Sequence, residues 1–208
     1  VERLPVGDED VKGTYDRFAR CTHGALIRND FEWMEYWRWE NEEERTAAVY
    51  YDAKDIPQGF LLYWVEEDVF HIREMVYLTQ EARKGLWNFI RAHYSMIDAV
   101  KGHIYTGEPL AFLLDESQIQ ETIEPYFMAR IVDVAQFLRL YPFEGSIRPF
   151  HFVVTDPMAE WNNGIFSVAT DREGTVSVTD EPAGKAVELD IQTLSAMLMG
   201  YKRPSYLA

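Results

Sequence analysis

Cysteine is nearly absent from this chain of 208 residues, in which Cys21 is the only one. A single cysteine cannot form a disulfide within the chain, and such a composition is typical of a reducing compartment. Long apolar runs are also lacking. No stretch approaches the roughly 20 apolar residues that a helix needs to cross a bilayer, and no signal peptide is recognisable. The sequence therefore predicts a cytoplasmic protein with no membrane partner.

Basic residues are scarce. Lysine and arginine number 20 against 35 aspartates and glutamates, which gives a formal net charge of −15. Nucleic-acid binding requires a basic face, so we expect no nucleic-acid partner. A cationic small molecule or a basic peptide would be attracted to such a chain. On charge alone, solubility is the simpler explanation.

Signatures of catalysis and cofactor binding are missing as well. The sequence has no G-x-S-x-G elbow, no P-loop and no dinucleotide-binding fingerprint. Cys21 lies inside a helical pattern that gives no reason for activation. The histidines show no metal-ligand spacing; they are residues 23, 71, 93, 103 and 151. From the residues alone we predict no catalytic residue, no metal and no bound cofactor.

Hydrophobic residues, in contrast, make up 47% of the chain and aromatic residues 14%, enough for a sizeable core. In the first part, helical spacing predicts helices from Asp8 to Gly24, over 29–40 and over 80–93. The helix over 29–40 is apolar around much of its circumference, which indicates burial on several sides or the wall of a cavity. Strands are predicted over 46–51, 59–65, 69–78 and 102–105.

From residue 133 the pattern changes. Asp133 and Asp190 are suited to cap two further helices, and Pro142 ends the first of them. Apolar runs predict strands over 123–132, 148–154 and 185–190, with a hairpin over 164–179. We therefore expect an α+β protein with two sheets, in which residues 1–120 form one domain and residues 121–208 a second. The apolar strand face of Phe150, Phe152 and Val154 should pack against both capped helices.

Glu74 interrupts the apolar side of the strand predicted over 69–78. An ionised carboxylate is costly there unless it is paired. One interpretation is a general base of raised pKa. The other, which we favour, is a structural carboxylate paired with Arg73, Lys101 or a backbone amide.

The turn into the helix over 80–93 is where an acyl-CoA-binding fold would hold a pyrophosphate. Such a site needs inward-pointing amides, with glycine where the phosphate approaches. Here the sequence offers only Gly85, and Arg83 stands where a further glycine would be wanted. We therefore expect this turn to bind coenzyme A poorly.

Three segments of the sequence carry a family resemblance. They read PYFMARIVDVAQFLRLYPF (125–143), DPMAEWNNGIFSV (156–168) and ELDIQTLSAMLMGYKRP (188–204). In this order they resemble the C-terminal half of the Eis (enhanced intracellular survival) family of GNAT N-acetyltransferases. The resemblance covers essentially the whole chain. It implies a degenerate GNAT-like mixed sheet followed by a sterol-carrier-protein-like α/β sandwich.

The resemblance also implies a function. Eis enzymes transfer acetyl from acetyl-CoA to amines of aminoglycosides or of lysine, and acetyl-CoA is bound by an N-terminal GNAT domain. This chain would supply substrate-pocket walls and an assembly surface, with that domain, a cationic substrate and further copies of the protein as partners. The family's general base is the C-terminal carboxylate, a role that we do not assign to Ala208.

Four residues are implied as substrate contacts by the same resemblance: Trp33, Glu124, Tyr126 and Phe127. An aromatic wall with a carboxylate suits a polyamine cation, so we expect Trp33 and Glu124 to face a shared cavity. Core packing is the alternative, favoured for Phe127 and evenly balanced for Trp33. For the whole chain, the alternatives are a module that binds a lipid or small apolar ligand, and a purely structural oligomerisation unit.

Overall fold

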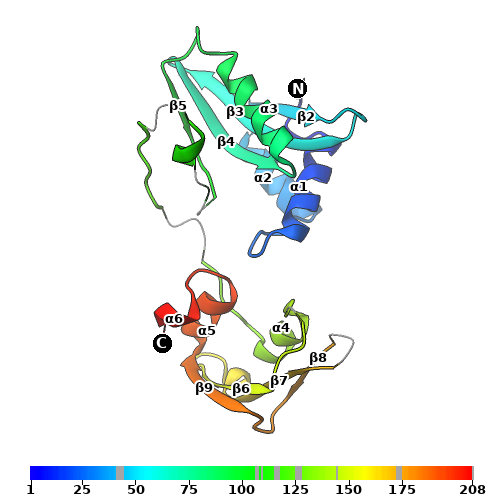
Figure 1. The fold of residues 1–208 in the computed structure, drawn as a ribbon, viewed down its shortest axis with the longest axis vertical. Coiled ribbons are helices and arrows are strands. Elements are labelled where there is room, and N and C mark those ends of the chain that lie inside the picture. Colours follow the sequence, from blue (N-terminus) through cyan, green and yellow to red (C-terminus); the bar gives the residue numbers. More distant parts are fainter. Residues whose placement is uncertain are drawn as a thin grey trace. The chain divides into compact units, whose positions relative to one another are not determined.

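The computed structural model describes residues 1–40, 45–105, 108, 110–114, 118–124, 128–143, 145–171 and 175–207. Its contacts divide the chain into two compact units, Val1–Glu121 and Thr122–Ala208, which we call unit 1 and unit 2 (Figure 1). Each unit has its own sheet and its own hydrophobic core.

Unit 1 is built on a five-stranded sheet of order β1-β2-β3-β4-β5. The first four strands pair antiparallel, and β5 pairs parallel with β4. The predicted strands β2, β3 and β4 are confirmed. The strands are β1 (Glu2–Leu4), β2 (Thr46–Tyr51), β3 (Pro57–Glu66), β4 (Val69–Tyr77) and β5 (Ala99–Gly102).

Three helices cover this sheet: α1 (Glu9–Cys21), α2 (Asp30–Glu40) and α3 (Gln80–Arg91). Side chains alternate across the strands of β2 and β3. Val49 and Phe60 join the core beneath α1 and α2, whereas Ala48 and Leu61 join the core beneath α3. Helices therefore lie on both faces of the sheet. The caps follow the sequence, because Asp8 accepts a hydrogen bond from the amide of Asp10 at the start of α1.

Two strand predictions are wrong, one in unit 1 and one at the start of unit 2. The fourth strand lies at 99–102 instead of 102–105, and its four residues pair only with β4. For α2, burial on several sides is not found among the described side chains, because Trp33 is buried whereas Phe31 and Met34 are exposed; the wall of a cavity stays a prediction. The described residues of 123–132 form no strand. No described strand pairs with them, and Ile123 is exposed.

Gly85 allows a close approach of α3 to the sheet. A methyl group at this position would lie 2.3 Å from two ring carbons of Tyr50 on β2. The packing of the helix against the sheet is therefore sufficient to explain the glycine.

We expect Gly85→Ala to destabilise unit 1. Overpacking typically costs about 1–3 kcal/mol, which outweighs the roughly 1 kcal/mol that alanine gains over glycine in a helix. Gly13→Ala in α1 is the matched control, because a methyl group there meets nothing within 4 Å and should stabilise the protein. Urea denaturation of both variants measures the difference. Equal stability of the two would show that the Tyr50 ring moves aside freely.

Unit 2 contains a four-stranded sheet of order β8-β7-β6-β9. The strands are β6 (Phe150–Thr155), β7 (Gly164–Thr170), β8 (Val176–Thr179) and β9 (Lys185–Asp190). Strand β6 is central, antiparallel to β7 and parallel to β9. The predicted hairpin is β7–β8, and the residues 172–174 of its turn lie outside the described residues.

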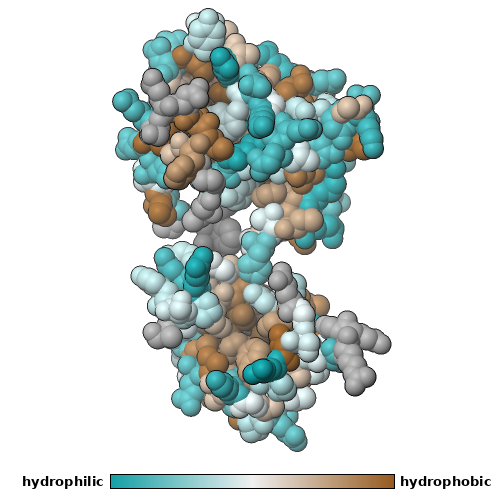
Figure 2. All heavy atoms as spheres, viewed as in Figure 1, coloured by the Kyte–Doolittle hydropathy of each residue, from teal (hydrophilic) through white to brown (hydrophobic). Residues whose placement is uncertain are grey.

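The helices α4 (Val134–Leu140) and α5 (Ile191–Leu198) pack on this sheet, and a short α6 (Pro204–Leu207) follows. As predicted, Asp133 and Asp190 cap α4 and α5, each accepting a hydrogen bond from a backbone amide three residues on. The predicted packing is also confirmed, since Phe152 and Val154 share a core with both helices. On the face that Figure 2 shows, some hydrophobic residues also reach the surface toward the middle of this unit, while the residues shared by the strands and both helices are buried. Unit 2 therefore has a packed core between its sheet and its helices.

The entry into unit 2 is tied to its last long helix. The amide of Ile131 donates to the Ser195 hydroxyl oxygen at 3.1 Å, and that hydroxyl donates to the carbonyl of Ile191 at 2.7 Å. Ile131 and Ser195 are both buried. Two segments 64 residues apart are thereby joined.

Candidate functional site

A bulge in β4 decides which way Glu74 points. The pairing register between β3 and β4 shifts next to Arg73, so Glu74 pairs with Leu62 and the next pair is Ile72 with Tyr63. As a result, Val76 belongs to the core beneath α1 and α2, whereas Ile72 belongs to the core beneath α3. The single apolar face that the sequence predicts for β4 is therefore divided between the two sides of the sheet.

Glu74 is paired with Arg28, from the segment between α1 and α2. The guanidinium donates two hydrogen bonds to the carboxylate, of 2.9 and 3.1 Å. Both side chains are largely buried, with 7% of Arg28 and 11% of Glu74 exposed. The prediction of a paired carboxylate is correct, but its partner is neither Arg73 nor Lys101. No local signal marks Arg28, which stands 46 residues away in sequence.

Three aromatic rings enclose the Arg28 guanidinium. Its central carbon lies 3.8 Å from the ring centre of Tyr15, 4.1 Å from that of Tyr36 and 4.7 Å from that of Trp33. Burial alone would lower the pKa of Arg28, but the Glu74 carboxylate more than offsets this effect and raises that pKa. Arg28 is therefore a permanently charged cation inside an aromatic enclosure.

Tyr36 completes the coordination of Glu74, since its hydroxyl donates to the carboxylate at 2.9 Å. Burial and the adjacent negative charge of Glu74 raise the pKa of Tyr36 far above its ordinary value. The phenol consequently remains protonated and keeps its role as donor. This arrangement satisfies the carboxylate fully and leaves it poorly suited to act as a free base.

Of the four residues predicted to contact substrate, the structure describes Trp33 and Glu124, and these two lie in different units. Trp33 is 7% exposed and packs edge-on against Tyr15 and Tyr36 within the core of unit 1. Glu124 is exposed in unit 2. Tyr126 and Phe127 lie outside the described residues. A shared cavity for Trp33 and Glu124 stays a prediction, because the two residues belong to different units.

The turn into α3 is filled by side chains. Thr79 caps the helix by accepting from the amide of Ala82 at 3.1 Å. One turn into the helix, the buried guanidinium of Arg83 forms an ion pair with Glu108. The Tyr77 hydroxyl donates to the same carboxylate at 2.5 Å. A carboxylate thus stands beside the helix start, the position where a pyrophosphate would bring its own negative charge.

The pKa of Tyr77 reflects this carboxylate. Burial, together with the hydrogen bond and negative charge of Glu108, raises the pKa of Tyr77 to about 12. The phenol therefore stays protonated and holds Glu108 in place from one side while Arg83 holds it from the other.

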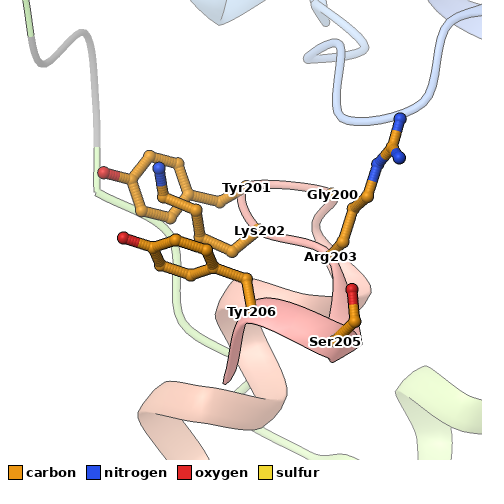
Figure 3. Close-up of a pocket in the computed structure, with 6 residues that line it drawn as sticks. All are labelled: Gly200, Tyr201, Lys202, Arg203, Ser205 and Tyr206. Atoms are coloured by element: carbon orange, nitrogen blue, oxygen red, sulfur yellow. The ribbon is translucent and has the colours of Figure 1, made fainter. Parts of the chain in front are cut away.

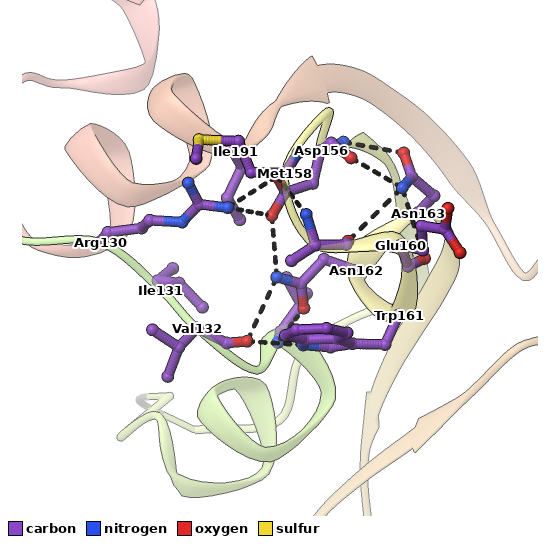
Figure 4. Close-up of polar contacts among 12 residues, drawn as sticks. Arg130, Ile131, Val132, Asp156, Met158, Glu160, Trp161, Asn162, Asn163 and Ile191 are labelled. Atoms are coloured by element: carbon purple, nitrogen blue, oxygen red, sulfur yellow. Dashed lines mark hydrogen bonds and ion pairs between the residues drawn. The ribbon is translucent and has the colours of Figure 1, made fainter.

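In unit 2 a buried carboxylate organises the loop between β6 and β7 (Figure 4). Asp156 is 2% exposed and accepts hydrogen bonds from Arg130 at 2.6 Å and from Asn162 at 2.9 Å. It also accepts from the amides of Met158 and Ala159. Burial alone would raise the pKa of Asp156, but these donors hold that pKa far below its ordinary range.

The same loop fixes the segment before α4. The Asn162 side chain accepts from the amide of Val134 at 3.1 Å and donates to the carbonyl of Val132. The Trp161 indole donates to that carbonyl at 2.8 Å (Figure 4). The DPMAEWNNG segment, which carries part of the resemblance, thus connects the loop between β6 and β7 to the start of α4. The side chains of Asp156, Trp161, Asn162 and Asn163 form internal hydrogen bonds, whereas Glu160 is exposed.

A hollow of about 430 Å³ lies near the C-terminal end of unit 2 (Figure 3). The Lys202 side chain extends between the rings of Tyr201 and Tyr206, with its ammonium 4.9 and 5.2 Å from their centres. The lining consists of Gly200, Tyr201, Lys202, Arg203, Ser205 and Tyr206. The lining thus combines two tyrosine rings with the charged side chains of Lys202 and Arg203.

Comparison with known families assigns both units. The profile of the acetyltransferase (GNAT) domain family matches residues 24–131, more than half of the chain. The chain belongs to the GNAT acetyltransferase family. The profile of the sterol carrier protein domain matches residues 134–208. The predicted order of a GNAT-like domain followed by a sterol-carrier-like domain is thereby confirmed.

Solved structures of GNAT proteins resemble this chain over almost its whole length. A probable N-acyltransferase from Enterococcus faecalis is 30% identical over 97% of the chain, with a TM-score of 0.83. A GCN5-related N-acetyltransferase from Anabaena variabilis is 28% identical over 99%, also with a TM-score of 0.83. Eis1 from Mycobacterium abscessus is 16% identical over 99%, with a TM-score of 0.72, and shares the fold.

This GNAT chain spans about half of those structures, covering 52%, 54% and 53% of them in the same order. No curated protein matches it. Within the described residues, no cluster of histidine, cysteine, aspartate or glutamate could hold a metal ion. Among the helices in that part of the chain, none is long and apolar enough to cross a membrane.

Proposed function

We propose that this chain is part of an Eis-type N-acetyltransferase that acetylates amines of aminoglycosides or of lysine-like cations. In that reaction the amine nitrogen attacks the carbonyl carbon of acetyl-CoA. The N–C bond forms, the C–S bond to coenzyme A breaks, and the amine loses a proton. This chain provides walls of the substrate pocket and an assembly surface, while a further GNAT domain binds acetyl-CoA.

The observation that carries this proposal is the order and extent of the family matches. A GNAT domain followed by a sterol-carrier-like domain occupies about half of relatives described as an N-acetyltransferase and as a probable N-acyltransferase. The other half of such a protein is long enough to hold a second GNAT domain. We therefore assign acetyl-CoA binding to that second GNAT domain and the walls of the substrate pocket to this chain.

The turn into α3 supports placing acetyl-CoA elsewhere. Glu108 puts a negative charge beside the helix start, and Gly85 is needed for packing on Tyr50. A pyrophosphate arriving at this turn would meet a like charge and a buried, occupied guanidinium of Arg83. The local chemistry therefore disfavours coenzyme A at this position.

We expect the chain alone to show no binding of acetyl-CoA in titration calorimetry and no release of coenzyme A with kanamycin or a lysine-rich peptide. The longer protein that includes the further GNAT domain is the positive control for both measurements. Micromolar binding of acetyl-CoA by the chain alone would contradict the assignment of the cofactor to another domain.

The substrate contacts proposed for Trp33, Glu124, Tyr126 and Phe127 are tested in that longer protein. Glu124→Gln should raise KM for a cationic substrate and leave kcat nearly unchanged, because it weakens attraction of the cation without touching the acetyl group. The lipid-binding alternative predicts a different result. In that case an organic extract of the purified chain would contain a bound lipid by mass spectrometry.

A further inference from the structure

The enclosure around Arg28 has the composition of a site for a cationic ligand. Rings on two sides and a carboxylate that accepts two parallel hydrogen bonds match the flat faces and the forked edge of a guanidinium. The walls come from three separate elements, with Tyr15 on α1, Trp33 and Tyr36 on α2, and Glu74 on β4.

These walls support one another without Arg28. Trp33 contacts the ring of Tyr15 edge-on at 5.2 Å and the ring of Tyr36 edge-on at 5.9 Å. The Tyr36 hydroxyl binds Glu74 directly at 2.9 Å. The enclosure is therefore fixed by contacts among the helices and the sheet.

Arg28 itself comes from none of these elements. It lies in the irregular segment 22–29 that links α1 to α2. In this segment Leu26 and Ile27 are 56% and 52% exposed, and the Tyr15 hydroxyl donates to the carbonyl of Leu26. The guanidinium is thus delivered from a connecting segment into a compartment built by others, as a ligand would be.

We propose that Tyr15, Trp33, Tyr36 and Glu74 form a guanidinium-binding site that Arg28 occupies as an internal ligand. A free cation of the alkylguanidinium class takes this site when the Arg28 side chain is removed. In the wild-type chain, Arg28 competes with such ligands from a high local concentration, so their binding is much weaker. The site is independent of acetyl-CoA and of the proposed acetyl transfer.

Chemical rescue tests the proposal. Arg28→Ala should lower the melting temperature of the GNAT unit by roughly 10 °C, because Glu74 loses its charge partner. Methylguanidinium chloride at about 20 mM should restore at least half of this loss, whereas equal sodium chloride or methylammonium chloride should restore little. Neither R20A nor wild-type protein should respond to methylguanidinium, since Arg20 pairs with Asp16 on the surface. R28A/E74Q should lose the rescue.

Two results would overturn the proposal. One is a folded R28A protein that methylguanidinium stabilises no more than it stabilises the wild type. The other applies to the case in which R28A does not fold in buffer. The assay then becomes refolding from urea, and a failure to recover folded protein with methylguanidinium present would show that no site exists without Arg28. Arginine amide and an arginine-containing tripeptide then distinguish small ligands from peptide side chains.

Discussion

Replacing Glu74 by alanine is expected to lower the free energy of unfolding of the GNAT unit by about 3–5 kcal/mol. The change leaves the Arg28 guanidinium buried, with its two hydrogen bonds to the carboxylate lost. It also removes the acceptor for the Tyr36 hydroxyl. Chemical denaturation monitored by tryptophan fluorescence measures the effect.

The control for this experiment is an ion pair of the same unit at the surface. Asp16 and Arg20 pair in α1 with 45% and 62% of their side chains exposed. Asp16→Ala should therefore cost less than about 1 kcal/mol. Glu74→Gln, which retains the shape and one acceptor oxygen, should fall between the two. Similar values for Glu74→Ala and Asp16→Ala would show that water reaches the Arg28 enclosure.

Replacing Asp156 by alanine is expected to lower the melting temperature of the sterol-carrier-like unit by roughly 10 °C, as typical for loss of a buried hydrogen-bond network. Arg130, Asn162 and two backbone amides lose their acceptor together. Glu160→Ala, on the exposed side of the same loop, is the matched control and should change little. Differential scanning calorimetry gives both values.

The pH dependence of this stability has a definite sign. Because the folded pKa of Asp156 is lowered, its stabilising contribution is fully present above the ordinary aspartate pKa of about 3.9. The contribution is lost as the pH falls from there through the lowered folded pKa. The gap in melting temperature between wild type and Asp156→Ala should therefore narrow in acid below about pH 4. A gap of constant size down to about pH 2 would contradict this origin.

Much of the fold follows from local sequence pattern. Alternating apolar residues define β2, β3 and β6, and side-chain caps at Asp8, Asp133 and Asp190 mark where helices begin. These signals depend on residues that are close in sequence, so they predict the elements without knowledge of the tertiary structure. The apolar run 123–132 carries the same local signal, but strand formation also needs a neighbouring strand to pair with, and the sequence does not reveal its absence.

The candidate site depends on contacts that sequence patterns cannot show. The charge of Glu74 on an apolar strand correctly indicates a partner, yet the bulge beside Arg73 turns it toward Arg28. In the same way, Arg83 stands out as a poor residue for a phosphate turn, whereas its partner Glu108 is 25 residues away. Pairings of this kind are decided by how elements pack.

The hydrogen bond between Ile131 and Ser195 has a consequence for folding during synthesis on the ribosome. Translation delivers residue 131 long before residue 195, and β9, which pairs with the central strand β6, also emerges late. Three contacts of unit 2 therefore form only after β9 and α5 have been synthesised. They are the hydrogen bond of the Ile131 amide, the pairing of β6 with β9 and the packing of α5 in the core. A nascent chain that stalls before β9 therefore exposes an unpaired edge of β6 and an open apolar core, the features that chaperones recognise.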